Sequence, residues 1–328
     1  MLGDRDHPMK PIASLSLDAD NLWSYLYIRG DRDWETAASY LPRMVPRVLD
    51  LFGARDLRIT FFVIGRDCLE DADAAGFRAL ADHGHEIGNH SFRHEPWLHR
   101  YSEMELDDEL GRAEDAIEAA TGVHTDGFRG PGYSLSEPTL RVLVKRGYRF
   151  DASTLPMVIG PIARAVYFRT AKLDTEQRAE REHLYGTWAD GMRPLRPYRW
   201  TVGDATMLEL PVTTLPGLRV PIHISYLLML ASYSEAAAAA YFRAALHMCR
   251  LAKVEPSILM HPLDLLSGDE VPELRFFPGM ALPLAKKLAC VDHYLDLLQR
   301  KFRVVPVGEH ATLAATRDLP LKAPRFVS

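Results

Sequence analysis

Short apolar runs alternate along this chain with longer segments whose apolar residues recur every three or four positions. The runs favour strands, because several are rich in β-branched and aromatic residues and are bounded by turn-forming residues. They lie at residues 11–17, 57–64, 85–88, 127–129, 148–150, 207–212, 257–260 and 302–306. The pattern therefore predicts about eight strands separated by helices.

The helical segments carry start and stop signals. Ser102 opens a segment that matches part of a capping box, and Gly122 is placed to end it. A second helix is expected over residues 136–147, from a serine cap to a glycine. Residues 234–251, which are rich in alanine, and residues 281–300 predict two more helices.

Strands that alternate with helices predict an α/β fold with a parallel sheet, and at 328 residues the natural closed form is a (β/α) barrel of about seven or eight strands. An open doubly wound sheet is the alternative. That fold places a glycine-rich phosphate turn after the first strand. Here the first strand runs into Asp18-Ala19-Asp20 instead, which favours the barrel.

Residues 154–203 interrupt the alternation of strands and helices. They carry no clear strand but cluster arginine, proline and aromatic residues, among them Trp188, Tyr198 and Trp200. A loop of this length is uncommon inside a compact domain. We therefore expect either a lid over a functional site or a homo-oligomer interface, for which arginine and aromatic residues are equally suited. The predicted division is one domain, the insertion within it and two terminal extensions, at residues 11–310, 154–203, 1–10 and 311–328.

Composition narrows the class of protein. The net charge of −5 comes from well-mixed acids and bases, which argues against a nucleic-acid-binding surface. No apolar run approaches the roughly 20 residues that span a bilayer, and the N-terminus lacks the pattern of a signal peptide. The odd number and wide spacing of Cys68, Cys249 and Cys290 argue against a disulfide framework. We therefore expect a cytoplasmic protein.

Polar residues follow the predicted strands at the points where these end. Because the C-terminal ends of parallel strands open on one face of a barrel, residues far apart in sequence should converge there. An isolated pair such as His90 and His94 is more often a pair of ordinary surface histidines. The full set makes a hydrolytic site the better interpretation: Asp18, Asp20, His90, His94, Arg129, Asp151 and His261.

These residue types can assemble a metal-dependent hydrolase. One carboxylate and two imidazoles are three ligands, which leaves a position open for water, as catalytic zinc sites require. The metal makes that water far more acidic. A second carboxylate can take its proton, and a distant imidazolium can protonate a leaving amine. Because Asp18 and Asp20 are two residues apart on an extended segment, both carboxylates point to the same side.

The ordered motifs resemble those of the polysaccharide deacetylase family, the NodB-homology fold of carbohydrate esterase family 4. The resemblance covers about residues 13–305. It rests on Ser-Leu-Asp18-Ala-Asp20-Asn, His90-Ser-Phe-Arg-His94, Arg129-Gly-Pro-Gly-Tyr133 and Leu-Met-His261-Pro. It implies a distorted, NodB-like barrel and hydrolysis of an N-acyl bond with one divalent metal, usually zinc, with cobalt, nickel or manganese as alternatives.

The resemblance also implies roles for single residues. Asp20, His90 and His94 would hold the metal. Asp18 would be the general base, held by Arg129, and His261 the general acid. The turn at Gly132 and Tyr133 would bind the oxyanion, through the backbone N–H of Tyr133.

The chain departs from the family at two motifs. Ala19 separates two aspartates that are usually adjacent, and the motif at Asp151 lacks its usual aromatic residue. Asp151 therefore joins the substrate residues with three roles open: to orient Arg129, to orient His261, or to form a cap or turn. Asp264 is another possible partner of His261.

The predicted function is removal of an N-acetyl group from an amino sugar. The alternatives are a deformylase or amidase acting on a small or lipid-linked amide, and a binding module without catalysis. A binding module has no need of both a base and an acid, so the complete set of Asp18, Asp20, His90, His94 and His261 argues against it.

Overall fold

The computed structural model describes residues 10–160, 173, 188–277 and 279–326 of the chain. Its strands are β1 (Ile12–Asp18), β2 (Thr60–Val63), β3 (Glu86–Asn89), β4 (Gly127–Phe128), β5 (Phe150–Asp151), β6 (Tyr198–Val202), β7 (Ala205–Glu209), β8 (Ser257–Met260), β9 (Arg303–Val305) and β10 (Leu321–Lys322). Its helices are α1 (Leu22–Arg29), α2 (Leu41–Gly53), α3 (Asp71–Asp82), α4 (Glu103–Thr121), α5 (Glu137–Arg146), α8 (Trp188–Gly191), α9 (Ile224–Ala231), α10 (Glu235–Leu251), α11 (Leu284–Lys301) and α12 (Val307–Ala315).

The strands form one mostly parallel sheet in the order β10-β6-β7-β5-β4-β3-β2-β1-β8, and β9 pairs with the first half of β1. Only the β6–β7 pair is antiparallel. The segment after β7 reaches β8, where the backbone N–H of Thr213 donates to the carbonyl of Ser257 at 2.9 Å. The Ser257 N–H donates in turn to Oγ1 of Thr213 at 2.8 Å. These bonds tie the segment that follows β7 to the edge strand β8, although the strands themselves do not close the sheet. The predicted α/β class is confirmed, and the curved sheet fits a distorted barrel.

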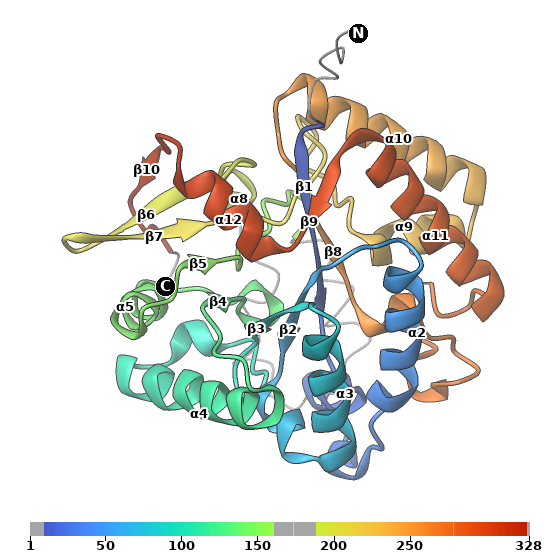
Figure 1. Ribbon diagram of the computed structural model, residues 1–328, viewed down its shortest axis with the longest axis horizontal. Helices are drawn as coiled ribbons and strands as arrows, with labels where there is room; N and C mark the ends of the chain where they lie inside the picture. The colour runs from blue at the N-terminus through green and yellow to red at the C-terminus, as the bar shows by residue number, and fades with distance from the viewer. Residues whose placement is uncertain (1–9, 161–172, 174–187, 278, 327–328) are drawn as a thin grey trace, which may run out of the picture.

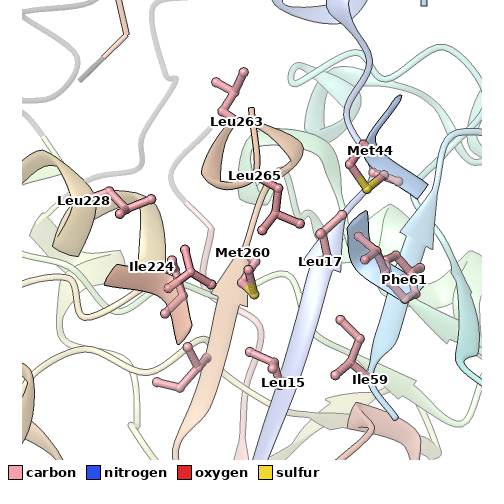
Figure 2. Close-up of a cluster of buried hydrophobic side chains, with 14 of the residues drawn as sticks. Leu15, Leu17, Met44, Ile59, Phe61, Ile224, Leu228, Met260, Leu263 and Leu265 are labelled. Atoms are coloured by element: carbon pink, nitrogen blue, oxygen red, sulfur yellow. The ribbon is translucent and has the colours of Figure 1, made fainter. Parts of the chain in front are cut away.

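The alternation of residues along β1 gives that strand two different faces. Leu15 and Leu17 point outwards and pack against Met260 of β8 and Phe61 of β2, in a core that α2 and α9 cover (Figures 1 and 2). Ser14, Ser16 and Asp18 alternate with them and are equally buried. Because side chains alternate across a strand, these polar residues line the other, inner side of the sheet. The inner row leads to Asp18 at the strand end.

Two of the predicted helices form as their sequence signals indicate. At α4, Oγ of Ser102 accepts from the N–H of Glu105 at 3.3 Å, and the Ser102 N–H donates to Glu105 Oε2 at 2.8 Å. Gly122 ends this helix with φ at 74°, a left-handed conformation that glycine adopts without strain. Ser136 caps α5 in the same way, through the N–H of Thr139. The capping box fixes the residue at which α4 begins.

The predicted insertion needs a correction. Part of it lies outside the described residues, but residues 198–202 form strand β6, which pairs with β7. Tyr198 and Trp200 are buried, in a core cluster with Phe128 and Leu140. They therefore cannot stack on a substrate. The alternation of buried and half-buried residues along β6 fits a strand whose one face is core.

The C-terminal residues also belong to the fold. The boundary predicted at residue 310 falls inside α12, and β10 pairs in parallel with β6. Residues 311–322 are therefore not a loose extension. Among the described residues, no helix is both long enough and apolar enough to cross a bilayer.

Candidate functional site

The strand ends bring the predicted residues to one edge of the sheet. Asp18 is the last residue of β1, and His90 directly follows β3, two strands away. Arg129 directly follows β4, and His261 follows β8 on the other side of β1. The convergence expected from parallel strands is therefore present in the structure.

Three buried side chains make a group of potential metal ligands. One donor atom each from Asp20, His90 and His94 lies within 4.8 Å of the others. Oδ1 of Asp20 is 3.0 Å from Nε2 of His94 and 3.4 Å from Nε2 of His90. Lone pairs of a carboxylate and two neutral imidazoles repel one another at this range unless a cation lies among them. The donor set therefore fits a divalent metal.

The pKa shifts within this group also favour a bound cation. Burial raises the pKa of Asp20, but His94 and His90 outweigh it and hold that pKa well below its usual value. Burial lowers the pKa of His90, yet the charges of Asp18 and Asp20 outweigh it and raise the pKa. The group thus stabilises positive charge next to ionised carboxylates. A metal ion provides that positive charge without a proton.

The ring of His90 is fixed by the backbone. Its Nδ1 lies 2.5 Å from the carbonyl oxygen of Arg129. Because a carbonyl can only accept, Nδ1 carries the proton and donates it. Nε2 then has the free lone pair and faces Asp20, the arrangement in which metal-binding histidines are usually held.

The backbone between the two histidines is a strained loop rather than a helix. Ser91 and His94 have φ values of 66° and 54°, in the left-handed region that disfavours side chains. The loop is held from two directions. The His94 N–H donates to Oγ of Ser91 at 3.0 Å. Oε1 of Glu109, on α4, accepts from the N–H groups of Phe92 and Arg93 at 3.0 and 2.5 Å.

Asp18 lies beside the metal group but has a different partner. Its Oδ1 is 2.6 Å from Nη1 of Arg129, and its Oδ2 is 3.9 Å from Nε2 of His90. Arg129 is completely buried and also donates to Oγ of Ser16 and to the carbonyl of Ala152. The guanidinium therefore fixes the orientation of the Asp18 carboxylate.

A family model of polysaccharide deacetylases matches residues 31–150. The matched range holds His90, His94 and Arg129, and the fold adds Asp18, Asp20 and His261 from outside it. The matched part of the chain is therefore similar to the polysaccharide deacetylase family.

Two relatives agree with this assignment. The peptidoglycan deacetylase of Helicobacter pylori is 27% identical over 151 residues, which cover 46% of this chain and 47% of that protein. The peptidoglycan-N-acetylmuramic acid deacetylase PdaA of Bacillus subtilis is 29% identical over 125 residues, 38% of this chain and 44% of PdaA. The chain thus spans less than half the length of these curated relatives.

A solved structure shares the whole fold. A candidate polysaccharide deacetylase from Mycobacterium smegmatis superposes with a TM-score of 0.63 at 19% identity, over 98% of this chain and 95% of that one. The agreement at low identity supports the distorted barrel typical of these deacetylases.

The turn predicted to bind the oxyanion is closed by a hydrogen bond of its own. Tyr133 has a φ of 63° and ends a short 3-10 turn that begins at Pro131. Its backbone N–H donates to the carbonyl of Gly130 at 3.0 Å. Gly132, with φ at 57°, allows the chain to close on itself there. In this structure that N–H bonds within the turn, and its role as oxyanion donor stays a prediction.

Asp151 also differs from its predicted role. It is fully buried, so it cannot touch a substrate. The Ser153 hydroxyl donates to its Oδ1. Burial raises the pKa of Asp151 well above its usual value, and the carboxyl of Glu209 raises it further. The raised pKa favours the neutral, protonated form of Asp151, next to the backbone segment that holds Arg129.

His261 is the last predicted member, and it stands apart from the metal group. It is half-buried at the end of β8, with Nδ1 2.9 Å from Oγ of Ser225 on α9. The Ser225 hydroxyl also reaches Oδ2 of Asp264 at 3.0 Å. Burial raises the pKa of Asp264, whereas His261 opposes the rise.

Four residues that contribute to the site have no local sequence signal: Tyr25, Glu109, Glu209 and Ser225. Burial and the charge of Asp20 raise the pKa of the Tyr25 hydroxyl well above its usual value, and Asp264 adds to the rise. Tyr25 therefore lies near both halves of the site. Its position one helical turn after Asn21, the cap of α1, was the only available hint.

Proposed function

We propose that this protein is a metal-dependent hydrolase that removes an N-acetyl group from an amino sugar. The observation that carries the proposal is the buried group of Asp20, His90 and His94, with Asp18 fixed beside it by Arg129. The sugar substrate is suggested by the two relatives, both of which are named as peptidoglycan deacetylases.

Asp20, His90 and His94 would hold the metal, for which zinc suits the two imidazoles and one carboxylate. A divalent ion there supplies Lewis acidity to the acyl group and to the attacking water. The remaining chemistry belongs to side chains of this protein. Because Arg129 occupies Oδ1 of Asp18, its Oδ2 is free on the side of the metal group to take a proton from the water.

The leaving group requires the opposite proton transfer. When the C–N bond breaks, the amine nitrogen must gain a proton, because an amide anion is too basic to leave. We assign this proton transfer to His261, which is half-buried at the end of the neighbouring strand β8. Water thus provides the hydroxyl of the released acetate, and the sugar leaves as the free amine.

The direct test is release of acetate from N-acetylglucosamine oligomers and from peptidoglycan fragments. We expect activity with added zinc and its loss after treatment with a chelator. The variants Asp18→Asn and His261→Ala should each lower turnover strongly. Exchange of the exposed Asp204 for asparagine, in the β6–β7 turn, is the matched control. If the metal-loaded protein releases no acetate from any N-acetylated sugar, the proposal is wrong.

A further inference from the structure

The hydrogen bonds around His261 form a chain that ends on a buried carboxylate. Nδ1 of His261 is 2.9 Å from Oγ of Ser225, and Oγ is 3.0 Å from Oδ2 of Asp264. The same Oδ2 accepts the backbone N–H of His261 at 2.9 Å. Ser225 comes from α9, whereas His261 and Asp264 belong to the turn after β8. These hydrogen bonds therefore join two separate elements of the fold.

The direction of the chain follows from its end. A carboxylate accepts hydrogen bonds and cannot donate, so the single hydrogen of the Ser225 hydroxyl must point to Asp264. The Ser225 oxygen can then only accept from the ring of His261, which places a proton on Nδ1. Nε2 of the neutral ring is left with the free lone pair, so it is the nitrogen that can take up and give a proton.

We propose that Ser225 and Asp264 are positioning residues that hold His261 in the Nδ1–H tautomer, with Nε2 directed at the leaving amine. This inference rests on the proposed function, because it assigns His261 the role of proton donor. Nε2–H is the bond that breaks when the amine is protonated. The ring recovers a proton at Nε2 from solvent before the next turnover.

The surroundings of the chain support a fixed arrangement. Asp264 is 2% exposed, so it has little access to water as an alternative partner. Lys287 on α11, also buried, donates to the carbonyls of Leu263 and Leu266 at 2.8 and 2.5 Å. It thereby clamps the turn that carries Asp264 and brings a positive charge near the carboxylate.

The titratable neighbour His223, whose ring lies 6.2 Å from that of His261, does not compete for His261 Nδ1. Burial lowers the pKa of His223 to about 3, and the nearby His261 adds to this, so His223 stays neutral. Its Nδ1 accepts the backbone N–H of Tyr226 as the cap of α9. Asp151 is engaged with Ser153 and Glu209. Ser225 therefore remains the partner that the ring of His261 uses.

The first experiment separates proton donation from the rest of catalysis. An N-acetyl sugar needs a protonated leaving group, whereas p-nitrophenyl acetate releases a stable phenolate that needs none. We expect Ser225→Ala to lower kcat on the amide by roughly 10–100-fold, part of the 10²–10⁴-fold that a general acid contributes, and to leave the ester rate unchanged. Ser225→Thr, which keeps the hydroxyl, should restore the amide rate.

Two controls complete the kinetic test. Ser232→Ala, at the other end of α9 and exposed, should change neither rate. In a His261→Ala background, Ser225→Ala should cause no further loss, because the two residues act as a unit. Equal losses of rate on the amide and the ester, or additive losses in the double variant, would overturn the positioning role of Ser225 and Asp264. The proposed deacetylase activity would still stand.

The second experiment does not depend on activity. In the zinc-loaded protein with ¹⁵N-labelled histidines, the His261 signals are assigned as those that vanish in His261→Ala. We expect the neutral ring to be the Nδ1–H tautomer in the wild type and to shift towards Nε2–H in Ser225→Ala. An Nε2–H tautomer of His261 in the wild type contradicts the proposed positioning role of Ser225 and Asp264. If the protein proves inactive on every acyl substrate, the proposed function fails and this spectrum still decides the tautomer.

Discussion

The two halves of the candidate site are built in different ways. On the metal side, Asp20, His90 and His94 are at most 7% exposed, and the loop that carries the histidines is fixed by backbone hydrogen bonds. On the acid side, His261 and Ser225 are only half-buried, and side-chain hydrogen bonds orient them. One half is fixed through the backbone and the other through side chains.

The difference follows from what each half would have to do. A metal is bound tightly only when its ligands are preorganised and shielded from water, which explains the strained but well-held loop at Ser91 and His94. A proton donor must recover its proton from solvent after each turnover, so it cannot be sealed in. Substitutions on the metal side should therefore lower the amount of bound metal. Substitutions on the acid side should instead lower the turnover rate by graded amounts.

The most disruptive change expected is loss of a metal ligand. Replacing His94 with alanine removes one of three donors and leaves Oδ1 of Asp20 without the ring nitrogen 3.0 Å away. We expect the metal content, measured by mass spectrometry of the purified protein, to fall to near zero while the circular dichroism spectrum is kept. Exposed His247, changed to alanine, is the control. A stoichiometric metal in His94→Ala would remove this residue from the ligand set.

The next effect separates the base from the ligands. Asp18→Asn keeps the shape of the side chain but loses its negative charge beside Arg129. We expect turnover on an N-acetyl sugar to fall about 10²–10⁴-fold, with the metal content unchanged. Loss of the metal in this variant would instead make Asp18 a ligand, and the roles of the two aspartates would have to be exchanged.

A third effect concerns stability on the metal side. Asp67 is 3% exposed and accepts from Nε1 of Trp23 at 2.6 Å, next to the cap of α1. Burial raises its pKa from 3.8 to about 7, and the charge of Asp73 contributes. Between pH 3.8 and about 7, Asp67 therefore keeps its proton in the folded protein and releases it in the unfolded chain. Its stabilising contribution is complete below pH 3.8 and is lost as the pH rises to about 7.

Asp67→Asn tests that sign, because an amide imitates the protonated acid at every pH. The free energy of unfolding in urea should fall between pH 4 and pH 7 in the wild type by more than in the variant. The difference should be on the order of 4 kcal/mol, from 1.36 kcal/mol per pKa unit. Exposed Asp204, changed to asparagine, should follow the wild type. Parallel curves for wild type and Asp67→Asn would show that the carboxyl is ionised in the fold.

The fold and the ends of its strands could be predicted because they depend on local patterns. Apolar runs ending in Asp18 or His261, and caps such as Ser102, are visible within a few residues of sequence. The aromatic residues of β6 were misread for the same reason. Tyr198 and Trp200 have the composition of a stacking surface, and only their pairing with β7 and burial against Phe128 reveal a core strand.

The support of the site could not be predicted, because it comes from distant elements. Glu109 is 17 residues from the loop residue Phe92 that it holds, and Ser225 is 36 residues from His261. Neither belongs to a motif, and each acts only once the helices have packed. The surroundings of Asp151 likewise depend on β7, whose Glu209 lies beside it in addition to the predicted neighbour Arg129.

The smallest effect expected tests whether the backbone really fixes the metal side. Oε1 of Glu109 accepts two N–H groups, from Phe92 and Arg93. Glu109→Ala leaves both without that partner, at a cost of about 1–3 kcal/mol for a buried donor, and should loosen the loop that carries His94.

We expect zinc affinity, measured by competition with a chelator, to fall about 10-fold in Glu109→Ala, the lower end of the range for residues behind metal ligands. Glu109→Gln retains an acceptor oxygen and should lose less. Glu118→Ala, on an exposed face of the same helix, should bind zinc like the wild type. Because Ser225 lies on the acid side, Ser225→Ala should leave the affinity unchanged. Zinc affinity in Glu109→Ala equal to that of the wild type would mean that the loop keeps its strained form unaided, and that backbone support does not distinguish the two halves.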